Sequence, residues 1–280
     1  MPYRPTDPRT HRPTDPQTYR RHFLATSASL VGATFCQPCS RCWAAASWID
    51  QQWVGPFHCH ADFSLVPYKG LFNQLERLQF DLVRSLGIDP AQGPIDLYLF
   101  RDKQSYRDFF KQHLPKVPYR RALFVKSEGG ARVFAYQHPE FSIDVRHECT
   151  HALLHAALEM VPLWLDEGLA EYFEVSEDKR PFDHPHLTAV KWNMRLGIVV
   201  PVASLEKKQS LAEMRRMEYR FSWAWVHFML HGPPQAHRAL IRFLADIQVA
   251  RPPGQLSERL ARRISHLDRR MVEHFKGWRR

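Results

Sequence analysis

The sequence predicts an α+β protein, with a small mixed β-sheet and helices in the first half of the chain and a mainly helical second half. The 280 residues are 44% hydrophobic, enough to bury a substantial core. Runs rich in strand-forming residues occur before residue 137, and from residue 141 onward apolar residues recur at helical spacing. We expect the main domain to span residues 47–250.

Strand signals are concentrated in four runs. FHCHADF (57–63) has the composition of a short strand and turn, and PIDLYLF (94–100) alternates like a second strand. RALFVK (121–126) and ARVFAY (131–136) are separated by Ser-Glu-Gly-Gly, which is typical of a β-hairpin.

Helices are expected between and after these strands. In the first half, 69–86 has helical spacing up to Gly87, and 102–113 begins with Asp102 in the N-cap position. The second half has the pattern of five helices, at 141–160, 164–174, 211–231, 234–249 and 255–278, with an irregular stretch over 178–209. Apolar residues of the last helix form one stripe and arginines the opposite face, so 251–280 is expected to be a basic amphipathic helix packed on the domain.

The net charge of +10 belongs to the two ends of the chain. Residues 1–46 carry six Arg against two Asp, and residues 251–280 carry nine Lys or Arg against three Asp or Glu, so 47–250 has no net charge. Proteins that bind nucleic acid use basic surfaces to contact phosphates. We therefore expect no nucleic-acid partner, and a basic nucleic-acid-binding protein is the weakest hypothesis.

The first 46 residues resemble a twin-arginine export signal. Arg20 and Arg21 are followed by an apolar, Ala- and Ser-rich run, and 44–46 is a small-residue cleavage site. The run is too short and too polar for a stable membrane span. We expect an exported protein in the periplasm or another extracytoplasmic compartment; the alternative is a disordered basic tail on a cytoplasmic protein.

Cysteine spacing adds little to this assignment. Cys36, Cys39 and Cys42 have the spacing of a metal or cluster motif, but its fourth position is Ala46. Metal binding there and lipid attachment to Cys36 are minor alternatives. The other two cysteines are too few for a disulfide framework, so the core must hold the fold.

A histidine motif lies in RHECTHALLH (146–155). His147 and His151 are four residues apart on the expected helix, so both imidazoles project from one face and can bind one metal ion. Glu148 can reach a metal-bound water without being a ligand, which completes the H-E-x-x-H pattern of zinc sites.

A catalytic zinc needs a third protein ligand and an open position for water. WLDEGLAEYFE (164–174) offers Glu167 and Glu171, which lie one helical turn apart, 16 and 20 residues after His151. A turn at 160–162 would fold this helix back against the first. It would then supply one ligand and one outer carboxylate from a single face.

HECTH followed by WLDEGLAEYFE resembles the gluzincin clan of zinc metallopeptidases, and is closer still to uncharacterised exported bacterial proteins with a peptidase-like zincin domain. The resemblance covers about residues 93–231 and implies a zincin-like fold with a thermolysin-like catalytic domain and one Zn²⁺ per chain. It implies these roles: zinc ligands His147, His151 and Glu167, general base Glu148, and Glu171 as the carboxylate that orients a ligand histidine. The short gap between His151 and Glu167 implies a reduced loop between the two helices.

These features predict an exported zinc metallopeptidase with a peptide or protein substrate. Tyr219 is the favoured oxyanion donor, with His227 as second candidate, and the resemblance implies that ARVFAY is the edge strand along which a substrate lies. The alternative is a non-catalytic zincin-fold protein that retains metal and engages cell-wall or surface polymers through the basic C-terminal helix. The sequence predicts no oligomeric state.

Neighbouring residues are expected to have structural roles. His155 is expected to pack or to support the site, and Cys149 to be a small core residue. Asp166 faces about 100° away from Glu167, so it is not expected to bind the metal. Trp223 and Trp225 are expected in the core.

Overall fold

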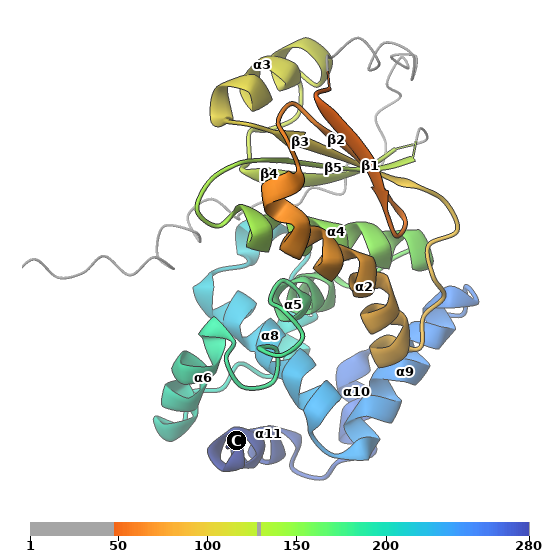
Figure 1. Cartoon of the computed structure of the whole chain (residues 1–280). Coiled ribbons are helices and arrows are strands. Elements are labelled where there is room, and N and C mark those ends of the chain that lie inside the picture. Colours follow the sequence, from red (N-terminus) through yellow and green to blue (C-terminus); the bar gives the residue numbers. More distant parts are fainter. Residues whose placement is uncertain (1–47, 128–129, 280) are drawn as a thin grey trace, which may run out of the picture.

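A computed structural model describes residues 48–127 and 130–279. These residues form an α+β fold with ten α-helices and one five-stranded mixed sheet, as the sequence predicts (Figure 1). The proposed export signal and the three N-terminal cysteines lie outside the described residues. Within those residues, every helix is too short or too polar to cross a membrane.

The sheet has the order β1-β2-β3-β5-β4. Its strands are β1 (Asp50–Val54), β2 (Phe57–Ala61), β3 (Ile95–Phe100), β4 (Ala122–Ser127) and β5 (Gly130–Tyr136). The two outer pairs are antiparallel, whereas β2, β3 and β5 run parallel. The expected hairpin is present, but the assignment of ARVFAY to the sheet edge is wrong: β5 pairs with β3 on its other side, so β4 and not β5 forms this edge of the sheet.

Helices cover both faces of the sheet (Figure 1). α3 (Lys103–His113) packs on β3 and β5 on one face, and the side chain of Asp102 caps its first turn as expected. α2 (Lys69–Leu86) and α4 (Phe141–Ala157) lie on the other face, and α2 ends at Gly87 in the left-handed conformation. Alternation along the strands supplies both layers: Leu97 packs toward α4, whereas Tyr98 packs toward α3.

From residue 141 onward all regular elements are helices, and they extend away from the sheet (Figure 1). After α4 it contains α5 (Leu163–Phe173), α6 (Pro185–Arg195), α7 (Val202–Leu205), α8 (Arg216–His231), α9 (Pro234–Gln248), α10 (Leu256–Ala261) and α11 (Leu267–Gly277). The stretch 178–209, expected to be irregular, contains α6 and α7. Pro185 and Pro201 stand at the starts of these two helices, where proline favours helix initiation.

The expectation of one continuous helix over 255–278 is wrong. The chain turns between α10 and α11, with His266 at a left-handed φ of 54°. Because of this turn both halves of the apolar stripe reach the core: Leu256 and Leu260 are buried on α10, and Met271 and Phe275 on α11.

α5 and α8 pack very closely at Gly168. A Cβ at this position would lie 2.7 Å from the carbonyl oxygen of Ser222 on α8, closer than real Cβ contacts allow. The glycine that weakens the helix prediction for α5 is therefore required by packing. This contact holds α8 against the helix that carries Glu167.

Candidate metal centre

The H-E-x-x-H residues lie in the middle of α4, between the sheet and α5. The helix is buried on almost every side from Val145 to Leu154, because β4 and β5 cover one face and α5 another. A helix in such a position keeps polar side chains only if they have partners. The partners of its histidines therefore define the site.

Three donor groups converge between α4 and α5. Nε2 of His147 and Nε2 of His151 are 3.2 Å apart, and the carboxylate of Glu167 lies 3.7 Å from the first and 3.9 Å from the second. All three side chains are at most 5% exposed. Their donor atoms lie within 4.8 Å of one another, so this group could hold a metal ion.

The far nitrogen of each histidine faces a second carboxylate. Nδ1 of His147 is 2.9 Å from Oε2 of Glu174, and Nδ1 of His151 is 2.9 Å from Oδ1 of Asp166. These contacts fix which nitrogen points toward the donor group, since a carboxylate on Nδ1 favours its protonated form and leaves Nε2 to bind. Arg146 donates to the backbone carbonyl of Glu174, so two adjacent α4 residues hold this glutamate in place.

Glu171 does not have the expected role of orienting a ligand histidine. Nδ1 of each ligand candidate is already matched to Glu174 or Asp166, whereas Oε2 of Glu171 lies 2.8 Å from Nε2 of His186. Its backbone oxygen also contacts His184, the N-cap residue of α6. Glu171 therefore fastens the start of α6 to α5.

Glu174 and the role of Asp166 are not among the predictions from the sequence. Glu174 follows Glu167 by seven residues, which is two helical turns, so the same periodicity that selected Glu171 also leads to Glu174. Asp166 is not expected as a ligand, because it faces away from Glu167 on the helix. In the structure this direction brings it to the outer side of His151 and to His155, 3.1 Å from its Nε2.

Glu148 lies beside the donor group and is held by the edge strand. Its Oε2 accepts a hydrogen bond from the backbone N–H of Phe124 on β4, at 2.8 Å. Burial raises the pKa of its carboxyl above the usual value, although the neighbouring His147 and His151 counteract this. A carboxyl with a raised pKa is better matched to proton transfer near neutral pH.

The two histidines are in a strongly negative environment. Burial alone lowers the pKa of His147, but Glu167 and Glu174 outweigh it and raise the pKa well above the usual value. The pKa of His151 is raised in the same way, with Asp166 outweighing burial. A positive charge between the imidazoles and carboxylates is therefore stabilised, which is the electrostatic condition for binding a cation.

Two further groups face this environment from other elements. Tyr219, on α8, is 4% exposed; burial together with the charges of Glu167 and Glu171 raises its pKa, so the hydroxyl stays protonated and can donate. Arg120, in the loop before β4, is 8% exposed and interacts electrostatically with Glu148 and Glu167. Its Nη2 has no hydrogen-bond partner among the described residues. No local sequence pattern points to Arg120.

The remaining expected residues lie in supporting positions. His227 is the second oxyanion candidate. Its Nε2 contacts the carbonyl oxygen of Pro181, and its Nδ1 faces His274. Both ring nitrogens are therefore engaged away from the donor group. His155 pairs with Asp166 and supports the site from outside. Cys149 is a fully buried free thiol, and Trp223 and Trp225 are in the core as expected.

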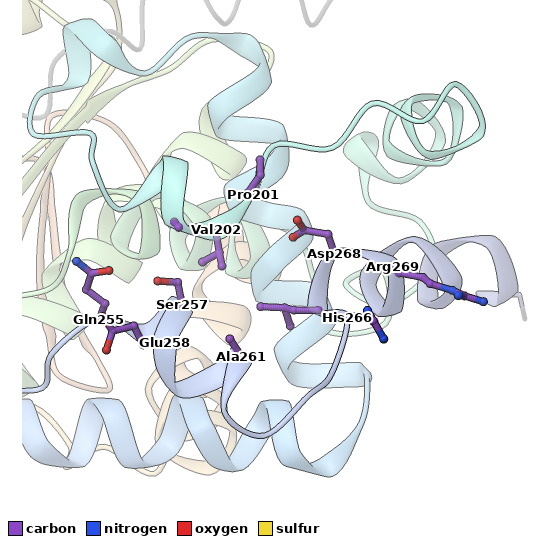
Figure 2. A pocket seen from close by; sticks show the side chains of 11 residues that line it. Pro201, Val202, Gln255, Ser257, Glu258, Ala261, His266, Asp268 and Arg269 are labelled. Carbon is purple, nitrogen blue, oxygen red and sulfur yellow. The ribbon is translucent and has the colours of Figure 1, made fainter.

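Among the described residues, two other groups of side chains could hold a metal ion: Glu171, Glu174 and His184 next to the first group, and His58, His60 and Asp96 on the sheet. A pocket of about 590 Å³ lies elsewhere, between α7, α10 and the start of α11 (Figure 2). Its lining residues include Val202, Ser257 and His266, but no member of these three groups.

Comparison with known proteins gives no assignment. No protein-family model matches the chain, and no curated protein matches it.

Proposed function

We propose that the chain is a zinc-dependent metallopeptidase with a zincin-like fold. The observation that carries the proposal is the convergence of two imidazole nitrogens and a carboxylate, with a second acid, Glu148, next to His147 on the same helix. Two histidines and a glutamate are a typical catalytic zinc set, which leaves a coordination position open. The carboxylates behind both imidazoles are the outer partners that zinc-binding histidines usually have.

In this proposal His147, His151 and Glu167 hold the zinc ion. When bound, zinc supplies a Lewis acid and lowers the pKa of a coordinated water. The backbone N–H of Phe124 fixes one oxygen of Glu148, leaving the carboxylate positioned to take a proton and deliver it to the leaving amine. Tyr219 and Arg120 are the two donors assigned to the charge that develops on the substrate carbonyl oxygen.

The substrate is expected to lie along β4. This strand is the sheet edge, and its backbone N–H at Phe124 already contacts the proposed base. An extended peptide can add to such an edge by main-chain hydrogen bonds. The export of the protein, and hence a substrate outside the cytoplasm, remains part of the proposal.

The test is metal analysis and peptide hydrolysis by the wild-type chain, the Glu148→Gln variant and the Glu159→Gln control. Glu159 is an exposed glutamate just after α4. We expect zinc in all three proteins, with hydrolysis of labelled casein or quenched peptides lowered roughly 10²- to 10⁴-fold only in Glu148→Gln.

Two other outcomes of the metal analysis and hydrolysis assay would point to different functions. Iron in place of zinc would contradict the assignment, because the same donor set also serves iron(II) oxygenases. Zinc without turnover by the wild-type chain would contradict the peptidase and support a non-catalytic metal-binding protein.

A further inference from the structure

A second group of histidines lies on the opposite face of the sheet from α4. His58 and His60 alternate along β2, so both project toward the face on which α3 packs, whereas Cys59 between them is buried toward α4. α3 itself contacts β3 and β5. At the β2 end of this face the side chain of His58 is partly exposed to solvent.

Asp96 completes the group from the neighbouring strand. It pairs with His58 in the parallel register of β2 and β3. Its Oδ1 lies 3.7 Å from Nδ1 of His58 and 3.8 Å from Nε2 of His60. The three donor atoms lie within 4.8 Å of one another.

Aromatic rings hold the two imidazoles in this orientation. His58 stacks on Trp53 of β1 with centroids 4.4 Å apart and planes at 5°, and His60 stacks on Tyr98 of β3 at 4.9 Å and 15°. Trp48, just before β1, also lies beside His60, with their ring centroids 5.9 Å apart. The donors are therefore pre-positioned, which lowers the entropic cost of binding a ligand between them.

The spacing fits a shared cation better than direct pairing. Contacts of 3.7 and 3.8 Å are too long for hydrogen bonds. Zinc bonds of about 2.0–2.1 Å in a tetrahedron place neighbouring donors roughly 3.3 Å apart, so each contact to Asp96 would shorten by about half an ångström on binding. Side-chain exposures of 31% for His58 and Asp96 leave room for a water ligand.

We propose that His58, His60 and Asp96 form a second binding site for a divalent transition-metal ion, zinc in particular. Two imidazoles and one carboxylate suit zinc, whereas an all-oxygen set would suit magnesium or calcium. The ion cross-links β2 and β3, two paired parallel strands whose chain connection runs through α2. Arg132, opposite Asp96 on β5, places a positive charge nearby and makes the site weaker than the centre on α4.

This site is independent of the proposed peptidase activity. The test compares the full-length chain with its His58→Asn/Asp96→Asn variant, both with Cys36, Cys39 and Cys42 changed to Ser so that N-terminal thiolates add no zinc. Zinc per folded chain is measured by mass spectrometry after equilibration with a fixed free zinc concentration. We expect the variant to bind one zinc ion fewer, while hydrolysis dependent on Glu148 is unchanged.

Two further variants protect the result against folding effects. Asp96→Asn alone preserves the shape of a partly exposed side chain and is expected to lower zinc affinity at least tenfold. His266→Asn, at an exposed histidine in the left-handed conformation, is expected to retain the parent zinc count. Equal zinc binding by the parent, Asp96→Asn and the double variant would overturn the proposal, whether or not the chain is a peptidase.

Discussion

Each ligand candidate on α4 is held by a different carboxylate behind its ring. Glu174 comes from the C-terminal end of α5 and Asp166 from its first turn, so one short helix supports both imidazoles and also supplies Glu167. Such outer partners set the tautomer and the ring orientation of metal-binding histidines. The metal affinity therefore depends on residues that do not contact the metal.

A matched pair of substitutions tests this dependence. Glu174→Gln removes the negative partner of His147 but preserves its shape, and we expect zinc affinity to fall roughly 10- to 100-fold. Glu171→Gln alters the contact with His186 instead, so its zinc affinity should remain within a few-fold of wild type. Competition with a chromogenic chelator measures both constants. A larger loss in Glu171→Gln would show that the expectation from the sequence motif was correct after all.

Substitution of Arg120 tests whether its guanidinium acts on the substrate. A buried guanidinium with an unpartnered Nη2 is costly to maintain, which suggests that it acts on the substrate. We expect Arg120→Met to lower kcat roughly 10²-fold, with zinc content unchanged, since the lost donor acts on the developing charge. Arg121→Met is the control: Arg121 pairs with Glu140 and Asp144, so its loss should lower stability and leave kcat of the folded fraction unchanged.

The candidate ligands are predictable from sequence for a simple reason. His147, Glu148 and His151 lie on one helix, whose geometry fixes their relation once the helix is recognised. Glu167 needed only the further assumption that the next helix folds back. Arg120 comes from a loop whose position depends on the sheet and on α3, and no local pattern carries that information.

At the scale of elements, the candidate metal centre depends on the close packing of α5 against α8. It places Tyr219 near Glu167, and it requires the absence of a side chain at Gly168. A Cβ there would meet backbone of α8, which cannot rotate away as a flexible side chain can. The two helices must then separate or one must bend.

Gly168→Ala is therefore expected to destabilise the protein despite the better helix propensity of alanine. Overpacking typically costs about 1–3 kcal/mol, and the propensity gain offsets at most about 1 kcal/mol. Gly70→Ala in α2 is the control, because nothing lies within 4 Å of its Cβ position, and it should be neutral or stabilising. Urea unfolding gives both free energies. A stabilised Gly168→Ala variant would show that α8 is not in contact at this point.

The elements that the sequence predicts well are those with strong local signals. Asp102 and Gly87 mark helix ends by capping chemistry that does not depend on the rest of the chain. β1 was missed because DQQWV has few apolar residues, as expected for an edge strand held mainly by its hairpin partner. The break before α11 cannot be seen in the sequence, because the apolar stripe continues through it.

For the whole molecule, stability is expected to depend on pH through a group of buried histidines away from the metal centre. Burial lowers the pKa of His184 to about 3, His227 to about 2, and His231 and His274 to about 4. They come from the start of α6, from α8 and from α11, and so connect the C-terminal helices to the rest. All four are neutral in the folded chain above pH 5.

The sign of the effect follows from proton binding. Below pH 6.5 the unfolded chain protonates these histidines while the folded chain does not, so stability falls as the pH falls from 6.5 toward 4. Each contributes a slope of up to about 1.4 kcal/mol per pH unit. His147 and His151, whose pKa values are raised, instead lose their contribution as the pH rises above 6.5. Among the described residues, Glu148 and Asp268, whose carboxyl pKa values are raised by burial, oppose the trend in the acid window.

Urea unfolding of metal-free protein at pH 7.0, 6.0 and 5.0 measures this dependence without metal loss. We expect the free energy of unfolding to decrease at each step, and His274→Gln, which removes one titrating group from α11, to have a shallower slope. An exposed histidine changed in the same way, His266→Gln, should retain the wild-type slope. A free energy that stays constant between pH 7 and 5 would mean that the four histidines are protonated in the folded chain, and that the contacts of α11 with α8 tolerate their charge.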